Sequence, residues 1–257
     1  MISRLWPPTL LAAALLGLWQ LYASLSGVSA TTLPPPTDVA TALWEERSML
    51  GSAAVTTSLE IVVGLLIAVV VGVCTGTVIS RSVRLGRAAY PLLIASQTVP
   101  VPAIAPLVVL WLGFDFGPKI VLIALVSFFP VTVATIDGLR SVDREMLSML
   151  RTMGAGRKRT FLMAEWPGAL PRVMTGVKTA AVLAPVGAVF AEWVGASDGL
   201  GYLILIWNNQ GLTAEMLAAV AVLGAIGLAL FGIVLLVGRA LLPWQRGEAP
   251  SGPFISL

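Results

Sequence analysis

Residues 58–79 read SLEIVVGLLIAVVVGVCTGTVI, an almost unbroken apolar run with Glu60 near its start. A hydrocarbon core about 30 Å thick is crossed by roughly 20 helical residues, so this run is long enough to span a membrane. A strand of a membrane β-barrel would alternate apolar and polar residues, and this run does not alternate. The stretch therefore predicts a transmembrane helix and a helical membrane protein.

The same character extends over the whole chain. Hydrophobic residues make up 57% of the 257 positions and charged residues 11%, with a mean hydropathy of +0.92. Soluble domains carry about 25% charged residues, so most of this surface must face lipid. We predict an all-α polytopic protein whose single domain covers residues 1–257. The six predicted spans are 9–28, 58–79, 88–112, 119–138, 173–194 and 216–242.

Basic residues predict the orientation of these spans. Fourteen of the sixteen Lys and Arg residues fall in or beside the termini and every second loop, and only Arg47 and Lys119 do not. The positive-inside rule then places both termini and the loops 80–87 and 139–172 in the cytoplasm. The sequence pI near 9.4 thus reflects topology and gives no reason to expect nucleic-acid binding. The fourteen are Arg4, Arg81, Arg84, Arg87, Arg140, Arg144, Arg151, Arg157, Lys158, Arg159, Arg172, Lys178, Arg239 and Arg246.

Two segments near the N-terminus admit two interpretations each. The first apolar run, ending in GVSA at Ala30, is favoured as an uncleaved helix, the alternative being a cleavable signal peptide. The segment TDVATALWEERSML has apolar residues at helical spacing after a helix start at Thr37 or Asp38. We expect a short helix on the outer membrane surface, the alternative being a plain connecting loop.

Prolines interrupt the third and fourth predicted spans at positions 91, 100, 102, 106 and 130. Proline removes a backbone hydrogen bond and kinks a helix, which a membrane tolerates where neighbours or a cavity satisfy the backbone. Ser96, Gln97, Thr98 and Pro100 are therefore candidates to line a pathway. The alternative is that these small polar residues hold helices together.

Glu192, followed by Trp193, is the other candidate for the pathway. It lies one or two turns inside the outer boundary of the fifth predicted span, where it could form part of a gate. The alternative, which the sequence favours, is a side chain that extends to the interface and pairs with a backbone donor.

Enzymatic chemistry finds no support in the residues. The chain has no His, which excludes His-based metal sites and Ser–His or Cys–His catalysis. The stretch GAGRKRT, residues 154–160, lacks the lysine placement and preceding strand of a phosphate-binding loop. Carboxylates within the spans lie mostly toward span ends, unlike those of ion-coupled transporters.

The loop 139–172 is basic and rich in Gly and Pro. It contains RTMGAGRKRTFLMAEWPGALP, residues 151–171. We expect a helix from an N-cap at Asp143 to Met153, a turn at Gly154, and a second short helix ended by Pro167 and Pro171. Two helices lying under a bilayer suit docking into a groove on a soluble partner. The alternative is a basic patch that contacts anionic lipid.

This loop resembles the EAA loop of ABC importer permeases, in which E-A-A is followed by three residues, a glycine, nine residues and I-x-L-P. Gly154 and Pro167 match the glycine and the proline. Glu145, one turn before the first E-A-A position, would replace the missing glutamate. The positions that depart from the pattern are Ser148, Met149, Leu150, Ala164 and Trp166. The resemblance implies contact with an ATPase through Glu145, Arg151, Gly154, Ala155, Gly156, Arg157, Lys158, Arg159, Phe161 and Pro167.

Five further stretches extend the resemblance over nearly the whole chain, to nitrate/sulfonate/taurine-type permeases. Within that group, the sequence of these stretches is most similar to that of permeases for thiamine pyrimidine precursors and riboflavin-like compounds. In chain order the stretches are LPPPTDVATAL, SQTVPVPAIAPLVVLWLGF, IDGLRSVD, PGALPRVMTGVK and AEWVGASDGLGYLI. The family implies a homodimer of type I importer fold in the bacterial cytoplasmic (inner) membrane. It also implies two cytoplasmic ATPase subunits, which bind the ATP and Mg²⁺, and an extracytoplasmic substrate-binding protein.

The outer loop GASDGLGYLILIWNNQG, residues 195–211, is the candidate for contacting that binding protein. The contact residues would be Asp198, Tyr202, Asn208, Asn209 and Gln210. A packed re-entrant gate is the alternative for this segment. For the whole chain, the alternatives are a stand-alone secondary transporter and a non-transporting scaffold. Scarce cations on the outer side and at the midplane slightly favour a neutral heteroaromatic substrate over sulfonate or nitrate.

Overall fold

The computed structural model describes residues 6–244, with side chains from residue 9, and these residues form helices and no strand. Arg4 and Arg246 lie outside the described residues. The helices are α1 (Trp6–Leu25), α2 (Pro36–Glu45), α3 (Arg47–Ser80), α4 (Val83–Ser96), α5 (Val101–Leu112), α6 (Phe116–Arg140), α7 (Arg144–Thr152), α8 (Arg157–Thr160), the π-helix η2 (Phe161–Glu165), α9 (Trp166–Trp193), α10 (Leu200–Gln210) and α11 (Thr213–Leu241). The all-α prediction is confirmed.

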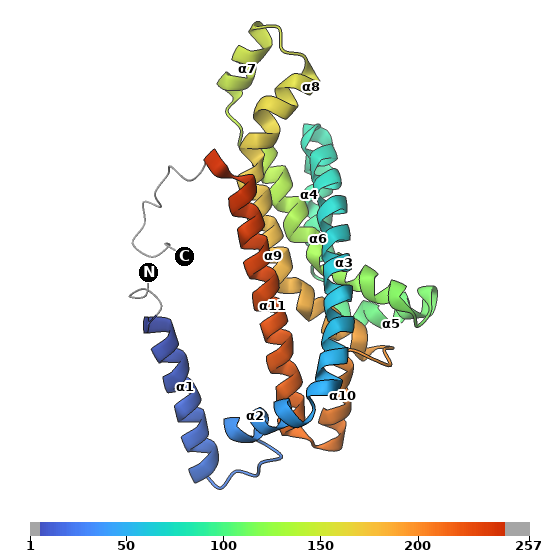
Figure 1. The fold of residues 1–257 in the computed structure, drawn as a ribbon. Helices are drawn as coiled ribbons and strands as arrows, with labels where there is room; N and C mark the ends of the chain where they lie inside the picture. The colour runs from blue at the N-terminus through green and yellow to red at the C-terminus, as the bar shows by residue number, and fades with distance from the viewer. Residues whose placement is uncertain (1–5, 245–257) are drawn as a thin grey trace.

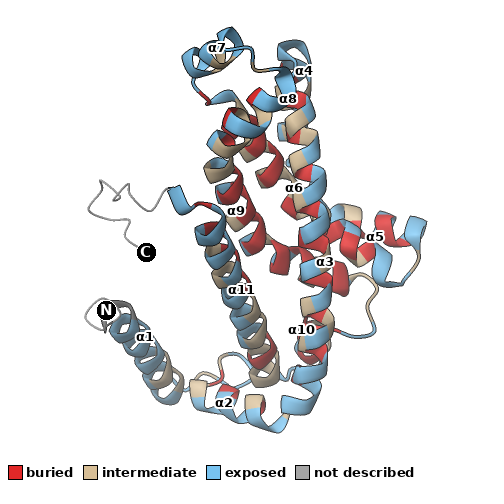
Figure 2. Cartoon of the chain, turned by 45° about the horizontal axis from the view of Figure 1, so that its top comes forward, coloured by how far each residue is buried: buried red, intermediate tan, exposed pale blue. Residues whose placement is uncertain are grey.

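Three long helices, α3, α6 and α9, form the centre of the molecule, and α11 lies along α9 (Figure 1). Helices α7 and α8 form one end of the bundle, and α2 and α10 lie at the other. Buried residues gather where α3, α6 and α9 face one another (Figure 2). The predicted cytoplasmic loop and the predicted outer segments therefore lie at opposite ends.

Glycines let these three helices approach closely, as is common where helices pack in membranes. A Cβ at Gly76 of α3 would lie 2.8 Å from the backbone oxygen of Thr132 and 2.7 Å from Cβ of Thr135, both in α6. A Cβ at Gly176 of α9 would lie 2.6 Å from the backbone oxygen of Pro130. Each glycine thus faces a backbone oxygen of α6, so a side chain at either position would push the helices apart.

Replacing Gly76 with valine should therefore destabilise the bundle by about 1–3 kcal/mol, the usual cost of overpacking a core. The matched control is Gly51→Val in the same helix, where a Cβ would meet no atom within 4 Å. Thermal unfolding of the two purified variants in detergent measures the difference. Equal melting temperatures for both variants would contradict the close approach of α3 and α6.

Four helical segments are long and apolar enough to cross a membrane, and the bent pair α4–α5 would be a fifth. They are Arg47–Ser80, Phe116–Arg140, Arg157–Trp193 and Thr213–Leu241. In the first predicted span, the part of α1 with described side chains, Thr9–Leu25, is apolar but shorter than these segments. The count of six spans and the cytoplasmic placement of the termini stay predictions.

The predicted third span is not one helix. It is broken after Ser96, and α4 and α5 meet at 95°. Pro100 is the N-cap of α5, and proline disfavours helical geometry in the residue before it. The break before Pro100 agrees with the proline-based prediction and is sharper than a kink within a continuous helix. Helices α4, α5 and α6 continue through Pro91, Pro106 and Pro130.

Two predicted boundaries near the membrane are wrong. Pro167 and Pro171 do not end the helix that begins at Arg157, which continues through both prolines to Trp193. The π-turn offers a reason, since the Trp166 amide already donates to the carbonyl oxygen of Phe161, five residues back, just before Pro167. The apolar helix α3 also begins at Arg47, eleven residues before the predicted span, and it continues through Gly51.

The outer segments are more helical than expected. The predicted short helix is confirmed as α2, which begins at Pro36 and ends at Glu45, and its place on the outer membrane surface stays a prediction. Gln20 of α1 accepts a hydrogen bond from the Thr37 amide at 3.3 Å. Residues 195–211, predicted as a loop, contain the eleven-residue helix α10, with Leu200, Leu203 and Trp207 buried. These buried residues agree better with a packed segment, the alternative given above, than with a loop.

Candidate functional site

The loop between α6 and α9 projects beyond the ends of the neighbouring helices (Figure 1). Its first half is as predicted, because Asp143 caps α7 by accepting a hydrogen bond from the Glu145 amide at 2.8 Å. Gly154 has a φ of +80°, which an L-residue rarely adopts, and it reverses the chain after α7. Helix α8 then begins after Gly156. Glycine therefore determines the direction in which α8 leaves α7.

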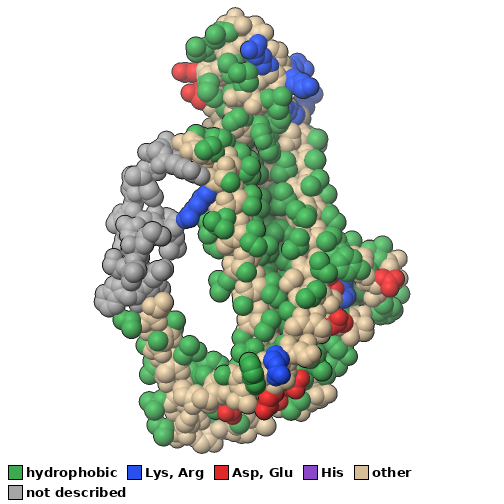
Figure 3. Space-filling view, in the orientation of Figure 1, with side chains coloured by type: hydrophobic (Ala, Val, Ile, Leu, Met, Phe, Trp, Pro, Cys, Tyr) green, Lys and Arg blue, Asp and Glu red, His purple; other side chains and the backbone are tan. Residues whose placement is uncertain are grey.

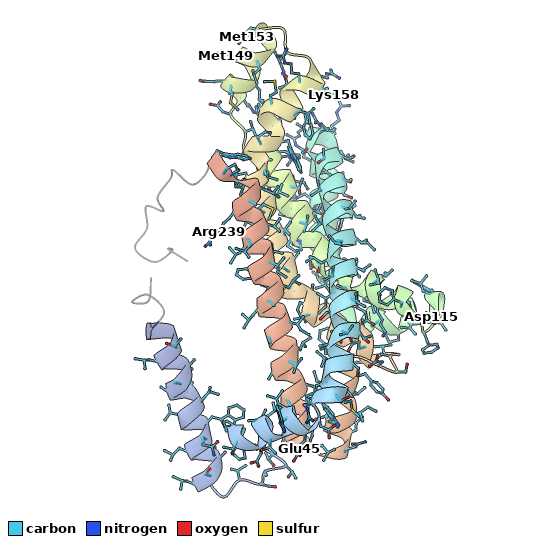
Figure 4. The ribbon with its side chains drawn as sticks, in the orientation of Figure 1. Glu45, Asp115, Met149, Met153, Lys158 and Arg239 are labelled. Carbon is cyan, nitrogen blue, oxygen red and sulfur yellow. The ribbon has the colours of Figure 1, made fainter. Side chains whose placement is uncertain are left out.

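The outer surface of this loop combines basic and flexible apolar side chains. Met149 is 63% exposed and Met153 72% exposed, and both lie at the far end of the loop with Lys158 nearby (Figure 4). Basic side chains gather at the same end of the molecule (Figure 3). Unbranched methionines adapt to the shape of a partner. The surface has the composition of a docking site for a protein. Its exposed members are Glu145, Met146, Met149, Arg151, Met153, Gly154, Gly156, Arg157, Lys158, Arg159, Leu162 and Met163.

The base of the loop is fastened to α3 by two residues that the sequence reasoning did not select. Arg81, directly after α3, pairs with Glu165 at 3.1 Å, and its guanidinium lies 4.5 Å from the ring centroid of Phe161. Phe161 is thus half-buried against α3 and is not part of the outer surface. The sequence places Arg81 and Glu165 more than eighty positions apart, so no local pattern marks them as partners.

At the opposite end of the bundle, Glu192 is buried and joins three helices. Its carboxylate accepts hydrogen bonds from the Thr57 hydroxyl of α3 at 2.7 Å and from the Gly201 amide of α10 at 2.5 Å. The Tyr202 amide donates to it at 3.3 Å, and the Leu200 amide donates to the Thr57 hydroxyl at 2.8 Å. Glu192 therefore serves as the N-terminal cap of α10 from a different helix. The predicted backbone pairing is confirmed, but extension to the interface is wrong, because Glu192 is only 1% exposed.

The residues around Glu192 fit this role. A Cβ at Gly199, whose φ is +117°, would lie 2.4 Å from the Glu192 carboxylate, and a Cβ at Gly201 would lie 2.8 Å from it. Asp198 accepts hydrogen bonds from the Gly199 amide at 2.7 Å and from the Thr56 hydroxyl at 2.8 Å. The glycines of the segment 199–201 thus make room for a carboxylate, a role that spacing alone does not reveal.

A second buried carboxylate lies one turn along α3 from Thr57. Glu60 is fully buried and pairs with Lys119 of α6 at 2.6 Å. Lys119, one of the two basic residues outside the predicted cytoplasmic group, is therefore held as a counter-ion inside the molecule. Together with the Glu192 contacts, this pair joins α3, α6, α9 and α10 at the outer end.

The structure does not bring the other pathway candidates to Glu192. Ser96, Gln97, Thr98 and Pro100 lie exposed at the bend between α4 and α5. The hydroxyls of Ser96 and Thr98 donate to backbone oxygens of their own segment, each at 2.7 Å.

Trp193 points into a separate apolar groove of about 650 Å³ between α9 and α11. Its ring meets Phe190 edge to face, with centroids 5.5 Å apart. Phe231 of α11 lines the facing side. The groove is thus walled by aliphatic and aromatic side chains along two of the longest helices.

The candidates for contacting a binding protein lie at both ends of α10. Asn208, Asn209 and Gln210 are exposed at its C-terminal end, Asp198 is exposed just before its start, and Tyr202 is half-buried. Leu203 and Trp207 between them face the bundle. Helix α10 thus presents two separate polar edges and a fixed apolar side.

The family model described as "binding-protein-dependent transport system inner membrane component" matches residues 61–247. The chain belongs to this family. It is an ABC importer permease, a non-enzymatic transport subunit of the inner membrane. A probable ABC transporter permease of Haemophilus influenzae is 38% identical to it, over 89% of this chain and 93% of the relative.

Other relatives of the permease are named for their solutes. The formylaminopyrimidine transport permease of Halalkalibacterium halodurans is 34% identical, over 94% of this chain and 96% of the relative. The riboflavin transport permease of Chloroflexus aurantiacus is 35% identical, over 93% and 91%. An aliphatic sulfonate permease of Bacillus subtilis (32% identical over 92% and 87%) and a taurine permease of Escherichia coli (29% over 91% and 87%) also match.

Among solved structures, the permease is similar to a chain of the inward-facing MetNI methionine ABC transporter, with a TM-score of 0.67. The match covers 77% of this permease and 98% of that chain at 16% identity. The similarity shows the fold of a type I importer permease.

Proposed function

We propose that two copies of this permease form the translocation pathway of an importer and couple it to a separate ATPase through the loop 139–172. The observation that carries the proposal is the projecting, basic and methionine-rich loop, which is fixed at its base and exposed at its end. ATP and Mg²⁺ bind to the partner, because the permease has no phosphate-binding loop of its own. Glu145, exposed on α7, takes the place of the glutamate that the EAA pattern lacks here.

The outer end contacts the substrate-binding protein through the two polar edges of α10. Because Glu192 ties the start of α10 to α3 and α9, force applied to α10 reaches two helices that span the membrane. The groove between α9 and α11 faces the partner copy and lines the pathway. This arrangement agrees with alternating access by two rigid bundles.

The substrate is a small organic nutrient similar to a thiamine pyrimidine precursor or to riboflavin. Support comes from two of the relatives named above and from the aromatic, uncharged lining of the groove beside Trp193. Flat heteroaromatic rings stack on such walls. Sulfonates, taurine and nitrate form the second class of candidate substrates, favoured by the names of the sulfonate and taurine permeases.

Reconstitution in proteoliposomes tests the proposal. The permease, an ATPase and a binding protein encoded beside its gene are combined, and uptake of labelled formylaminopyrimidine, riboflavin, taurine and an alkyl sulfonate is measured with and without ATP. We expect ATP-dependent uptake of one of the two heteroaromatic solutes and a dimeric permease by light scattering. Uptake driven by an ion gradient without the ATPase would instead establish a stand-alone secondary transporter.

A further inference from the structure

A polar cavity of about 660 Å³ lies between the end of α3 and the loop 139–172. Three arginines face it, namely Arg81 after α3, Arg151 in α7 and Arg157 at the start of α8. Glu165 is the one carboxylate in its lining, and it pairs with Arg81. Among the described residues, neither Arg151 nor Arg157 forms an ion pair with a carboxylate. The cavity therefore carries an excess of positive charge.

An apolar groove of about 500 Å³ lies between the last two turns of α3 and the helical segment that begins at Phe161. Cys74 and Val78 of α3 line one wall, and Leu162 and Trp166 line the other. Val78 lies one turn before Arg81 on α3, and Phe161 is shared, since its ring lines the groove and supports the Arg81 guanidinium. The contact between Arg81 and Phe161 therefore links the two cavities, one basic at the loop and the other apolar along α3.

From this juxtaposition we propose that the two cavities together bind one anionic phospholipid. Its phosphate contacts the guanidiniums of Arg81, Arg151 and Arg157, and one acyl chain lies in the groove beside Cys74 and Val78. Guanidinium groups bind phosphate through paired hydrogen bonds. The phosphate level is set by Arg81, the first residue after the membrane-spanning helix α3. The site does not depend on which solute the transporter carries.

The apolar groove is what favours a lipid over a free phosphate. A soluble anion would use only the arginines and leave Leu162, 54% exposed, and Val78, 60% exposed, without a partner. Met149 and Met153 lie at the far end of the loop, so a lipid bound at Arg81, Arg151 and Arg157 would leave these two methionines exposed. The lipid would join α3 to the loop at the place where Arg81 already joins them.

Native mass spectrometry of the purified full chain tests the site with dioleoylphosphatidylglycerol and dioleoylphosphatidylcholine, which differ only in headgroup. We expect preferential retention of phosphatidylglycerol. Arg151→Gln combined with Arg157→Gln should lower that retention about 25-fold, since each basic residue near an anionic lipid contributes roughly fivefold. The matched control is Arg84→Gln with Arg87→Gln, which removes the same charge from exposed positions on the same side and should change retention less than about twofold.

A second variant tests the acyl-chain groove without touching an arginine. Val78→Trp fills the groove and should weaken phosphatidylglycerol retention about tenfold, while glycerol 1-phosphate in millimolar excess should not displace the lipid. Equal losses in the two double variants would overturn the proposal, because general surface charge would then explain binding. Displacement by glycerol 1-phosphate, together with unchanged retention in Val78→Trp, would show a soluble phosphate site and would also overturn it.

Discussion

Replacing Glu192 with alanine should abolish ATP-dependent uptake and destabilise the permease by about 2–6 kcal/mol. The loss leaves the amide of Gly201 and the hydroxyl of Thr57 buried without their acceptor, and each unsatisfied group costs about 1–3 kcal/mol. Helix α10 would lose its cap and its fixed position on α3. Thermal unfolding in detergent and uptake in proteoliposomes measure the two effects.

Two further variants separate the cap from a general effect of charge. Glu192→Gln keeps an oxygen acceptor for the Gly201 amide and should retain most of the stability. Glu45→Ala removes an exposed carboxylate at the same end of the molecule and should change the unfolding free energy by less than about 0.5 kcal/mol. If Glu192→Ala and Glu45→Ala unfolded at the same temperature, the buried network would not stabilise the outer end.

The second large effect is expected at Gly154. Gly154→Ala forces an alanine to a φ of +80°, which costs roughly 1–2 kcal/mol or redirects α8 away from its docked position. Copurification of the partner ATPase with the tagged permease should fall about 5- to 30-fold, the factor that corresponds to this free energy.

Gly156→Ala is the matched control for this experiment. The substitution is the same and lies two residues away, and a Cβ at either position would meet no atom within 4 Å. The difference is that Gly156 has a φ of −67°, which alanine adopts freely. ATPase recovery should therefore stay at the wild-type level. Equal losses in both variants would point to surface contact rather than to the turn.

Much of the architecture could be predicted because it depends on local patterns. Apolar length predicted the long helices, Asp143 predicted the start of α7, and Gly154 predicted the turn after it. Pro100 predicted a kink in the third span. In each case a few neighbouring residues determine the structure.

The rest depends on contacts between distant residues. The capping of α10 by Glu192 requires Thr57, 135 positions earlier in the chain, and pairing of Arg81 with Glu165 requires two helices to meet. Pro167 was expected to end a helix, because the π-turn before it leaves no clear mark in the sequence. A single sequence shows which residues differ from their surroundings, such as a carboxylate in an apolar segment. It does not show which of these residues contact one another in the fold.

The unbroken helical segment Arg157–Trp193 has a mechanical consequence. Its 37 residues extend about 55 Å at 1.5 Å per residue, from the first residues of α8 to the residue after Glu192. Such a segment acts as a lever, and a tilt of about 5° about one end displaces the other by roughly 5 Å. Movement of the ATPase at one end and opening at the other end would then be coupled through one continuous helical segment.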